Sequence, residues 1–241
     1  MPRPFLTARW SDIVLLTFEA PEALLRRAIP PGAELDHWNG RTHVSIVALH
    51  MRDVRILGWG IPGFTAHPQV NFRTYVRCGG EPGVWFIRQF VPSRVIAAVG
   101  RLRYDEPLLP TPIRRRVVDA PSELRAEYAV GPEALGWHVN VAGSRAARIP
   151  ADTSPEHYFT QRGFGCRARA DGALSVFRVA HPPWAVREVR SVDYRFDFGS
   201  LYGAEWEFLN KAAAVSVVFA EGSAVAVYPP AVYPPTDSAS T

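Results

Sequence analysis

The stretch Val70-Asn71-Phe72-Arg73-Thr74-Tyr75-Val76-Arg77 gives the clearest strand signal in this 241-residue chain. Its side chains alternate with a period of two, which places successive residues on opposite faces of a β-strand. The polar face carries Asn71, Arg73, Tyr75 and Arg77. The turn sequence Gly79-Gly80-Glu81-Pro82-Gly83 then leads into the apolar run Val84-Trp85-Phe86-Ile87. The stretch therefore predicts the first strand of a β-hairpin.

Similar strand patterns recur along the chain, separated by glycine and proline. They cover residues 42–49, 101–104, 124–130, 137–141, 164–168, 174–179, 192–198 and 213–220. Helices are predicted at residues 21–28, 92–99 and 155–161, the last because Ser154 and Pro155 suit a helix start. Many short strands and few helices predict an α+β fold, mostly antiparallel β, in which a curled sheet or barrel carries helices at its edges.

Composition limits the partners of this chain. No apolar run reaches the roughly eighteen residues of a membrane span, and residues 1–11 lack the basic and apolar parts of a signal peptide. The formal net charge is +4, but the arginines are interleaved with acids along the chain. We therefore predict a cytoplasmic protein with no membrane and no nucleic-acid partner. The one tight run, Arg114-Arg115-Arg116, is predicted to be a solvated surface turn.

The sequence carries no metal or cofactor motif. Cys78 and Cys166 lie 88 residues apart without a Cys-x-x-Cys spacing, so both are predicted to be reduced thiols. The histidines are scattered, and no carboxylate cluster has the spacing of metal ligands. Gly58–Gly63 matches the letters of a dinucleotide-binding glycine motif, but Pro62 and Pro68 break any following helix, so a loop is predicted. We expect no metal and no cofactor.

The C-terminal residues differ from the rest of the chain. Ala226-Val227-Tyr228-Pro229-Pro230 is repeated at once as Ala231-Val232-Tyr233-Pro234-Pro235, and small polar residues follow. Such a tail favours a polyproline conformation and has little to bury. We expect a single domain over residues 1–228 and a disordered tail over residues 229–241. Binding to a proline-recognising domain is an alternative role for this tail.

A second stretch carries a family resemblance. Gly100-Arg101-Leu102-Arg103-Tyr104-Asp105-Glu106-Pro107-Leu108-Leu109 resembles the active-site segment of acetoacetate decarboxylases, in which two lysines follow the proline. In those enzymes the first lysine forms a Schiff base with the substrate ketone. Leu108 and Leu109 stand in the lysine positions here, and a leucine offers no amine to a carbonyl. The only lysine of the chain is Lys211.

Further segments, in the right order, resemble the YqjF-like family of the acetoacetate decarboxylase-like superfamily. They are residues 5–10, 31–36, 44–47, 70–76, 154–160 and 181–184. The resemblance implies a mostly antiparallel sheet curled around a central ligand cavity. It places Leu108 beside this cavity, and Tyr104 either lines the cavity or packs against other side chains. It also places Gln69 where the decarboxylases carry a glutamate. The departures at Leu108 and Gln69 together argue against decarboxylation.

Candidate site residues follow from this implied cavity. Asn71 and Tyr75 flank Arg73 on the polar face of their strand, and the two-pronged guanidinium of Arg73 suits a carboxylate or an enolate. A solvated face is the alternative. His181, whose backbone is fixed by the prolines that follow it, is a candidate for proton transfer or for a loop-holding hydrogen bond. Trp184 is expected to contact the substrate.

Glu156 has two interpretations. It lies in the first turn of the predicted helix, where the helix dipole stabilises a carboxylate without any chemistry. If it points inward toward Arg162 or His181, it becomes a candidate general base. Arg162 is assigned with the substrate-binding residues.

The sequence therefore predicts a protein with a pocket for a small molecule. The preferred hypothesis is an enzyme that acts without a Schiff base, as a lyase, isomerase or cyclase, on a keto- or enol-containing compound. The alternative is a non-catalytic binder or sensor of a hydrophobic organic acid. A third interpretation is an interaction module that uses the Tyr-Pro-Pro tail. A homo-oligomer is compatible with the resemblance.

Overall fold

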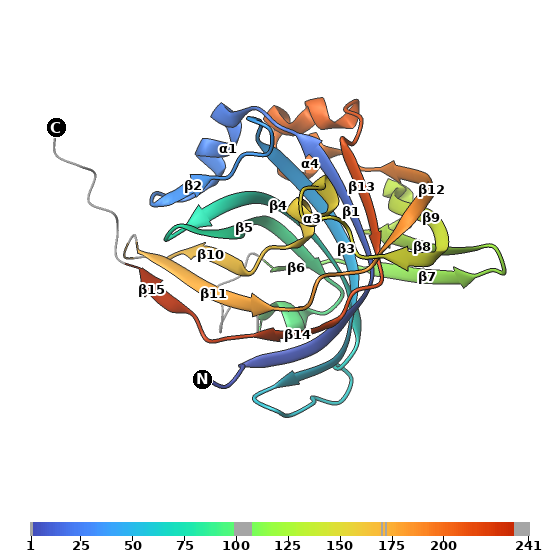
Figure 1. Ribbon diagram of the computed structural model, residues 1–241, viewed down its shortest axis with the longest axis horizontal. Helices are drawn as coiled ribbons and strands as arrows, with labels where there is room; N and C mark the ends of the chain where they lie inside the picture. The colour runs from blue at the N-terminus through green and yellow to red at the C-terminus, as the bar shows by residue number, and fades with distance from the viewer. Residues whose placement is uncertain (1, 99–107, 170, 172, 234–241) are drawn as a thin grey trace.

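The structure is a computed structural model that describes residues 2–98, 108–169, 171 and 173–233 (Figure 1). Within these residues, one continuous 15-stranded sheet forms most of the molecule. The sheet closes on itself because β14 pairs with β11 on one side and with β1 on the other. The closed part is a barrel of seven strands. In spatial order they are β1 (Leu6–Glu19), β3 (His43–Ile56), β4 (His67–Cys78), β5 (Glu81–Val91), β10 (Phe164–Ala168), β11 (Leu174–Ala180) and β14 (Ala224–Val227).

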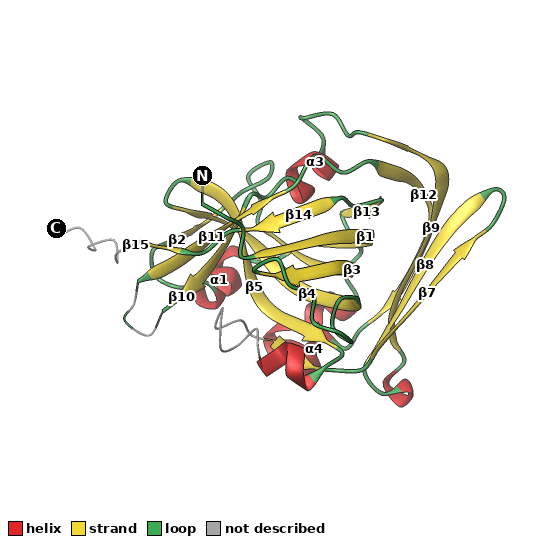
Figure 2. Cartoon of the chain, turned by 90° about the horizontal axis from the view of Figure 1, so that it is seen from below, coloured by secondary structure: helices red, strands yellow, loops and turns green. Residues whose placement is uncertain are grey.

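The sheet branches at β1. The first half of β1 pairs with β14 through Leu6–Arg9, and its second half pairs with β13 through Ile13–Thr17. From this branch a second layer of antiparallel strands extends away from the barrel, as Figure 2 shows. Its strands are β13 (Ser216–Ala220), β12 (Val186–Arg195), β9 (Trp137–Arg148), β8 (Glu123–Val130) and β7 (Ile113–Asp119). The predicted mostly antiparallel, barrel-like fold is thus confirmed.

Three short strands are added at other edges, and the helices are short. The strands are β2 (Ala33–Leu35) beside β4, β6 (Leu108–Pro110) beside β5 and β15 (Ala231–Tyr233) beside β11. The helices are α1 (Glu22–Ala28), η1 (Glu133–Leu135), α3 (Pro155–Thr160), α4 (Phe198–Tyr202) and η2 (Ala204–Asn210), together with a helical segment at residues 94–98. No helix in the described ranges has both the length and the apolar character needed to cross a bilayer.

Two hydrophobic cores follow from the two faces of the barrel strands. One face of β1, β3 and β4 packs outward against the second layer, α1 and α4, around residues such as Phe18, Phe72 and Phe198. The other face points into the barrel and includes Leu15 and Val47, and Trp184 from the connection between β11 and β12 packs in the same core. Because side chains alternate along a strand, the same segments supply both cores. The inward face is the one that positions the candidate site.

The local prediction for α3 holds, since the helix starts where its capping residues lie. The Ser154 hydroxyl accepts a hydrogen bond from the backbone amide of His157 at 3.2 Å, and Pro155 occupies the first helical position. Both features satisfy or remove amide donors that the first turn leaves unpaired. The helix places Phe159 against the end of the barrel.

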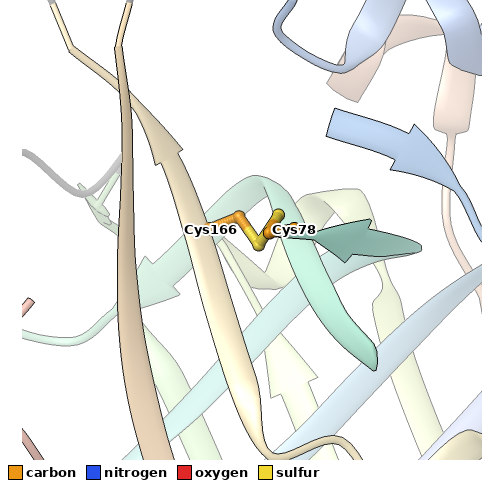
Figure 3. Close-up of a disulfide and its surroundings, with 2 residues drawn as sticks. All are labelled: Cys78 and Cys166. Carbon is orange, nitrogen blue, oxygen red and sulfur yellow. A yellow bond between two sulfur atoms is a disulfide. The ribbon is translucent and has the colours of Figure 1, made fainter. Parts of the chain in front are cut away.

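The prediction that both cysteines are free thiols is wrong. Cys78 at the end of β4 and Cys166 in β10 form a disulfide, which Figure 3 shows between the two strands. Both cysteines are buried in a small cluster with Val76, Leu174 and Val176. The prediction failed because the 88-residue separation concealed that β10 lies beside β5 and close to the end of β4.

Other local predictions are also corrected. Arg114–Arg116 lies inside strand β7 and pairs with β8, because the apolar residues that follow extend the strand. Residues 231–233 form β15 along β11, so the polypeptide beyond Pro230 is ordered for one more short strand. The predicted 192–198 strand ends at Arg195, and α4 begins at Phe198. The strand predicted at residues 101–104 lies outside the described residues, as do residues 234–241.

Candidate ligand cavity

The interior of the barrel contains a cavity of about 240 Å³, which we call the lumen. Inward-facing side chains of β1, β3, β4, β5, β11 and β14 form its walls. The loop between β3 and β4, the 94–98 helical segment and β6 surround its mouth. Most of the lining is aliphatic or aromatic, and the few polar groups in such a cavity are the ones that orient a ligand.

Strand β4 supplies the main polar stripe of the lumen. His67, Gln69, Asn71 and Arg73 occupy alternate positions, and all four line the cavity. The period of two along a strand directs them to the same face. Of the two interpretations that the sequence left open for this face, cavity or solvent, the structure places Asn71 and Arg73 at the cavity. Gln69, which the resemblance singled out, lies on the same face.

Arg73 lies at the inner end of this stripe and is buried. Its Nη2 donates a hydrogen bond to the Phe159 carbonyl at 3.0 Å, whereas its Nε has no partner. Its guanidinium carbon lies 5.7 Å from the centre of the Tyr75 ring. Burial lowers the pKa of Arg73 below its ordinary value, but an arginine remains charged in a protein. Within the described ranges, no carboxylate forms an ion pair with it.

Several lining residues have buried polar atoms without a hydrogen-bond partner in the described structure. These atoms are Trp10 Nε1, His67 Nδ1, Asn71 Oδ1 and Arg73 Nε. Gln69 differs, because its amide donates to Gln89 Oε1 at 2.8 Å across to β5. A buried polar atom without a partner costs about 1–3 kcal/mol, so such atoms in a cavity indicate where a ligand or water binds.

His67 lies at the opposite end of the stripe from Arg73, near the mouth. The two positions are six residues apart along the strand, which corresponds to about 20 Å. Burial lowers the pKa of His67 to about 4, and the neighbouring His50 adds to this effect. The imidazole is therefore neutral near pH 7. Because of the separation along the strand, His67 and Arg73 cannot contact the same small chemical group.

The inner end of the lumen is closed by an aromatic plug. Tyr75 is fully buried, and its hydroxyl forms a 2.5 Å hydrogen bond with Ser45. Phe159 of α3 packs on Tyr75 with ring centres 5.1 Å apart. Arg162 pairs with Asp36 and lies 3.8 Å from the centre of the Tyr158 ring. Tyr75 and Arg162, which the sequence assigned to substrate binding, do not line the lumen and instead hold its closed end together.

His181 and Trp184 form a pair beside the lumen. Trp184 lines the cavity, and its indole donates to Ser223 Oγ at 3.1 Å. His181 stacks on the Trp184 ring with centres 4.5 Å apart, while its Nδ1 lies 2.9 Å from the Pro182 carbonyl. Burial lowers the pKa of His181, and the charge of Arg73 lowers it further. Trp184 lines the cavity, whereas His181 is not among its lining residues.

Glu156 does not point into the lumen, which corrects its second interpretation. It accepts a hydrogen bond from Arg148 at 3.0 Å and lines a separate surface hollow with Ser144 and Val186. Burial favours a higher pKa for Glu156, but hydrogen bonds from its own backbone amide, Ser154 and Arg148 outweigh it and lower the pKa. The capping interpretation accounts for Glu156.

The decarboxylase-like segment meets the lumen through a single described residue. Leu108 begins β6, lines the cavity and is buried, whereas the side chain of Leu109 is partly exposed. Tyr104 lies outside the described residues. Lys211 lies at the end of η2, on the exposed surface and apart from the cavity lining.

Sequence reasoning missed several lining residues. Trp10 lies in β1, where the sequence analysis predicted no strand. Phe86 lies in a strand whose inward face was not distinguished, and Gln89 lies beyond the predicted end of that strand. Trp59 and Ile61 lie in the glycine-rich 58–63 loop, which was predicted as a loop but not as part of a mouth. A strict period of two through residues 84–91 separates Phe86 from Gln89 and Val91, because the register of β5 against β4 shifts between Phe86 and Arg88.

The closed barrel with its lined interior defines a protein of the acetoacetate decarboxylase-like fold with an internal cavity. The fold is shared with solved structures at low sequence identity. An acetoacetate decarboxylase from Legionella pneumophila is 14% identical with a TM-score of 0.61, over 97% of this chain and 88% of that one. The enduracididine biosynthesis enzyme MppR, solved in complex with pyruvate, is 13% identical with a TM-score of 0.64, over 98% and 92%.

The chain belongs to the DUF2071 family of uncharacterized conserved proteins, whose model matches residues 7–224. A curated relative, the uncharacterized protein YqjF of Bacillus subtilis (strain 168), is 33% identical over 99 residues. That match spans 41% of this chain and 41% of the relative. The resemblance to the YqjF-like family inferred from short segments is confirmed.

Proposed function

We propose that the lumen binds a keto- or enol-containing organic acid and acts on it without forming a Schiff base, as a lyase, isomerase or cyclase. One observation carries this proposal. Arg73 is a buried cation that faces an apolar cavity and lacks a carboxylate partner among the described residues. A buried, unpaired charge is costly, so its presence is best explained by an anionic guest that pairs with it.

The side-chain amide of Asn71, next to Arg73 on the same face, favours a ligand that carries both an acid group and a hydroxyl. Asn71 lies two positions from Arg73 on the same face of β4, and its Oδ1 lacks a donor. The Nε of Arg73 lacks an acceptor. An enol or hydroxy acid offers both, because its oxyanion accepts from the guanidinium while its hydroxyl donates to the amide oxygen. Stabilising an enolate in this way is the central step of many isomerases and lyases.

The groups around the lumen favour chemistry without a covalent intermediate. Leu108 presents a hydrocarbon side chain to the cavity, and Lys211 is remote and exposed. Proton transfer is assigned to His181, whose lowered pKa keeps the imidazole neutral and able to accept a proton near pH 7. Its stacking on Trp184 places it one side chain away from the lumen.

A second candidate function is non-catalytic binding or sensing of a hydrophobic organic acid. It is favoured by the predominantly apolar walls and by the position of Glu156, which is paired with Arg148 outside the lumen. Both candidates share the anionic guest at Arg73. They differ in whether the bound molecule is chemically changed.

Hydrogen exchange separates the two candidates. Phenylpyruvate or pyruvate is incubated with the protein in heavy water, and proton NMR follows loss of the signal from the carbon next to the ketone. We expect exchange above the rate without protein, and we expect Arg73→Gln to slow it by about 10²–10³-fold, as for loss of an oxyanion donor. Arg178→Gln is the matched control, because Arg178 is exposed on the outer face of β11.

Binding without exchange would select the binder. Absence of both binding and exchange with all keto acids tried would contradict the proposal. Borohydride reduction followed by intact-mass measurement tests the non-covalent claim, for which we expect no adduct. A reduced adduct on Lys211 would overturn it.

A further inference from the structure

We propose that the mouth of the lumen docks on the surface of an anionic lipid bilayer. The contact surface, which we call the mouth patch, consists of Leu57, Trp59, Ile61 and Val95. This goes beyond the function proposed above, because it concerns where the protein works and not which molecule it changes. It departs from the prediction of no membrane partner, which rested on the absence of a spanning segment.

The mouth patch is exposed and apolar. The exposed fractions are 80% for Trp59, 62% for Leu57 and 53% for Val95. These residues come from two segments far apart in the sequence, the β3–β4 loop and the 94–98 helical segment. Trp59, Ile61 and Val95 also line the lumen, so the patch and the opening of the cavity are continuous.

The turn at Leu57 is built at a conformational cost. Ile56 and Trp59 exchange two backbone hydrogen bonds of 2.9 Å, and the two residues between them have positive φ angles, 51° at Leu57 and 87° at Gly58. Such a tight turn favours asparagine or glycine at the first position, where leucine is strained. Folding alone gives no reason for a strained, exposed leucine, and strained residues concentrate at functional sites.

Positive charge surrounds the patch. Arg52 and Arg55 lie in β3 just before the loop, and Arg9 pairs with Arg52 in the β1–β3 register. All three are exposed and form no ion pair within the described structure. Asp53 is the only acid between residues 52 and 66. A tryptophan-bearing apolar tip with flanking arginines is the chemistry of interfacial binding to anionic lipids.

A second copy of the chain fits this surface less well. Apposing two mouth patches would bring the arginines of both copies together, and like charges across an interface are unfavourable. An anionic bilayer instead neutralises the arginines while it buries the tryptophan and leucine. It also gives an amphipathic acid a direct route between the bilayer and the lumen.

The test is co-flotation of the full chain with vesicles. We expect binding to equal mixtures of phosphatidylcholine and phosphatidylglycerol, weaker binding in high salt, and little binding to phosphatidylcholine alone. We expect Trp59→Ser to weaken the affinity by roughly tenfold or more, by analogy with loss of a buried interfacial aromatic group. Val215→Ser is the matched control, because Val215 is 56% exposed beside Thr17, at the other end of β1.

Two further variants keep the proposal falsifiable if Trp59→Ser affects folding. Leu57→Asn relieves the strained turn, so we expect a higher midpoint of thermal unfolding together with weaker vesicle binding. The double variant Arg52→Ser/Arg55→Ser should lower the affinity for anionic vesicles by about fivefold per arginine, whereas Arg27→Ser on α1 should not.

Vesicle binding that survives all mouth-patch variants, or no binding at low salt, would overturn the proposal. Light scattering that shows a dimer of the wild type and a monomer of Trp59→Ser, without vesicle binding, would assign the surface to a second copy. Keto-acid binding by Leu57→Asn and by Arg52→Ser/Arg55→Ser, whose residues do not line the lumen, is expected to persist, so a failure here does not depend on the outcome at Arg73.

Discussion

At the scale of single residues, the account depends on Arg73. Its charge is buried, its Nη2 donates to the Phe159 carbonyl, and its Nε has no hydrogen-bond partner among the described residues. An unpaired buried charge lowers the free energy of unfolding of the ligand-free protein, and a bound anion offsets this cost by pairing with the charge. Stability and binding should therefore change in opposite directions when the charge is removed.

We expect Arg73→Met to raise the free energy of unfolding by about 1–2 kcal/mol, because an uncompensated buried charge is replaced by an apolar chain of similar length. Urea denaturation of the ligand-free proteins measures this difference. The same variant should lose affinity for organic acids. A variant that is less stable than the wild type by a similar amount would show that the Phe159 contact outweighs the cost of the charge.

His67 gives a prediction for pH. Burial lowers its pKa to about 4 in the folded protein, whereas the unfolded chain titrates near about 6.5. The unfolded state thus binds more protons between these values, so the stability contributed by the neutral imidazole is full above about pH 6.5 and is lost as the pH falls toward about 4.

The difference in the pKa of His67 between the folded and unfolded chain corresponds to about 3 kcal/mol in the free energy of unfolding. We expect the wild type to lose this much more stability than His67→Gln between neutral and acidic pH, as measured by urea denaturation across that range. Parallel pH profiles for the two proteins would contradict the burial of an uncharged His67.

Residue roles could be predicted where strand alternation alone decides them. Asn71 and Arg73 follow from the period of β4, and Gln69, Leu108 and Trp184 follow from the family resemblance. Tyr75 has the same parity as Arg73, yet Phe159 covers it. Phe159 belongs to a helix about eighty residues further along the chain, so its contact with Tyr75 could not be predicted from the sequence of β4. Arg162 pairs with Asp36 at the closed end of the lumen, and His181 stacks on Trp184 beside it, and these contacts between distant segments could not be predicted from the sequence around either residue.

At the scale of elements, the disulfide is the feature that sequence reasoning predicted wrongly. It joins the end of β4 to β10 over an 88-residue separation. β10 also pairs with β5 in parallel, and parallel neighbours are distant in sequence. A reduced thiol pair was the default for a cytoplasmic chain, and disulfides are more typical of oxidising compartments. The cytoplasmic location therefore stays a prediction that the disulfide weakens.

Removing the disulfide tests its contribution. For a closed loop of this length, we expect Cys78→Ala/Cys166→Ala to lower the free energy of unfolding by about 4 kcal/mol, chiefly because the unfolded chain gains conformational freedom. Urea denaturation with and without reductant measures it, and reductant should leave the double variant unchanged. Wild-type stability that does not respond to reductant would contradict a disulfide that stabilises the barrel.

Element types were otherwise predictable where the signal is local. The β4–β5 hairpin and β10 follow from alternation and turn residues, and α3 follows from its capping sequence. The β7 strand was missed because its arginines resemble a solvated turn. In the structure Arg115 pairs with Asp12 of β1, so one of these charges is satisfied between the two layers.

At the scale of the whole molecule, barrel closure is what creates the site. It requires β1 near the start of the chain to pair with β14 near its end, in the Leu6–Val227 register. The sequence predicted a curled sheet, but the closing pair could be inferred only through the family resemblance. The second layer on β13 covers the outer face of the barrel and leaves the inner face free to enclose a guest.

The most direct test of this account is the binding of phenylpyruvate and of its neutral methyl ester, measured by calorimetry for the wild type and Arg73→Gln. We predict that the wild type prefers the acid by about tenfold or more, since a hydrogen-bonded charge pair contributes at least ~1.5 kcal/mol. We predict that Arg73→Gln removes this preference. Equal affinity of the wild type for acid and ester, or a preference that survives in the variant, would contradict an anionic guest held at Arg73.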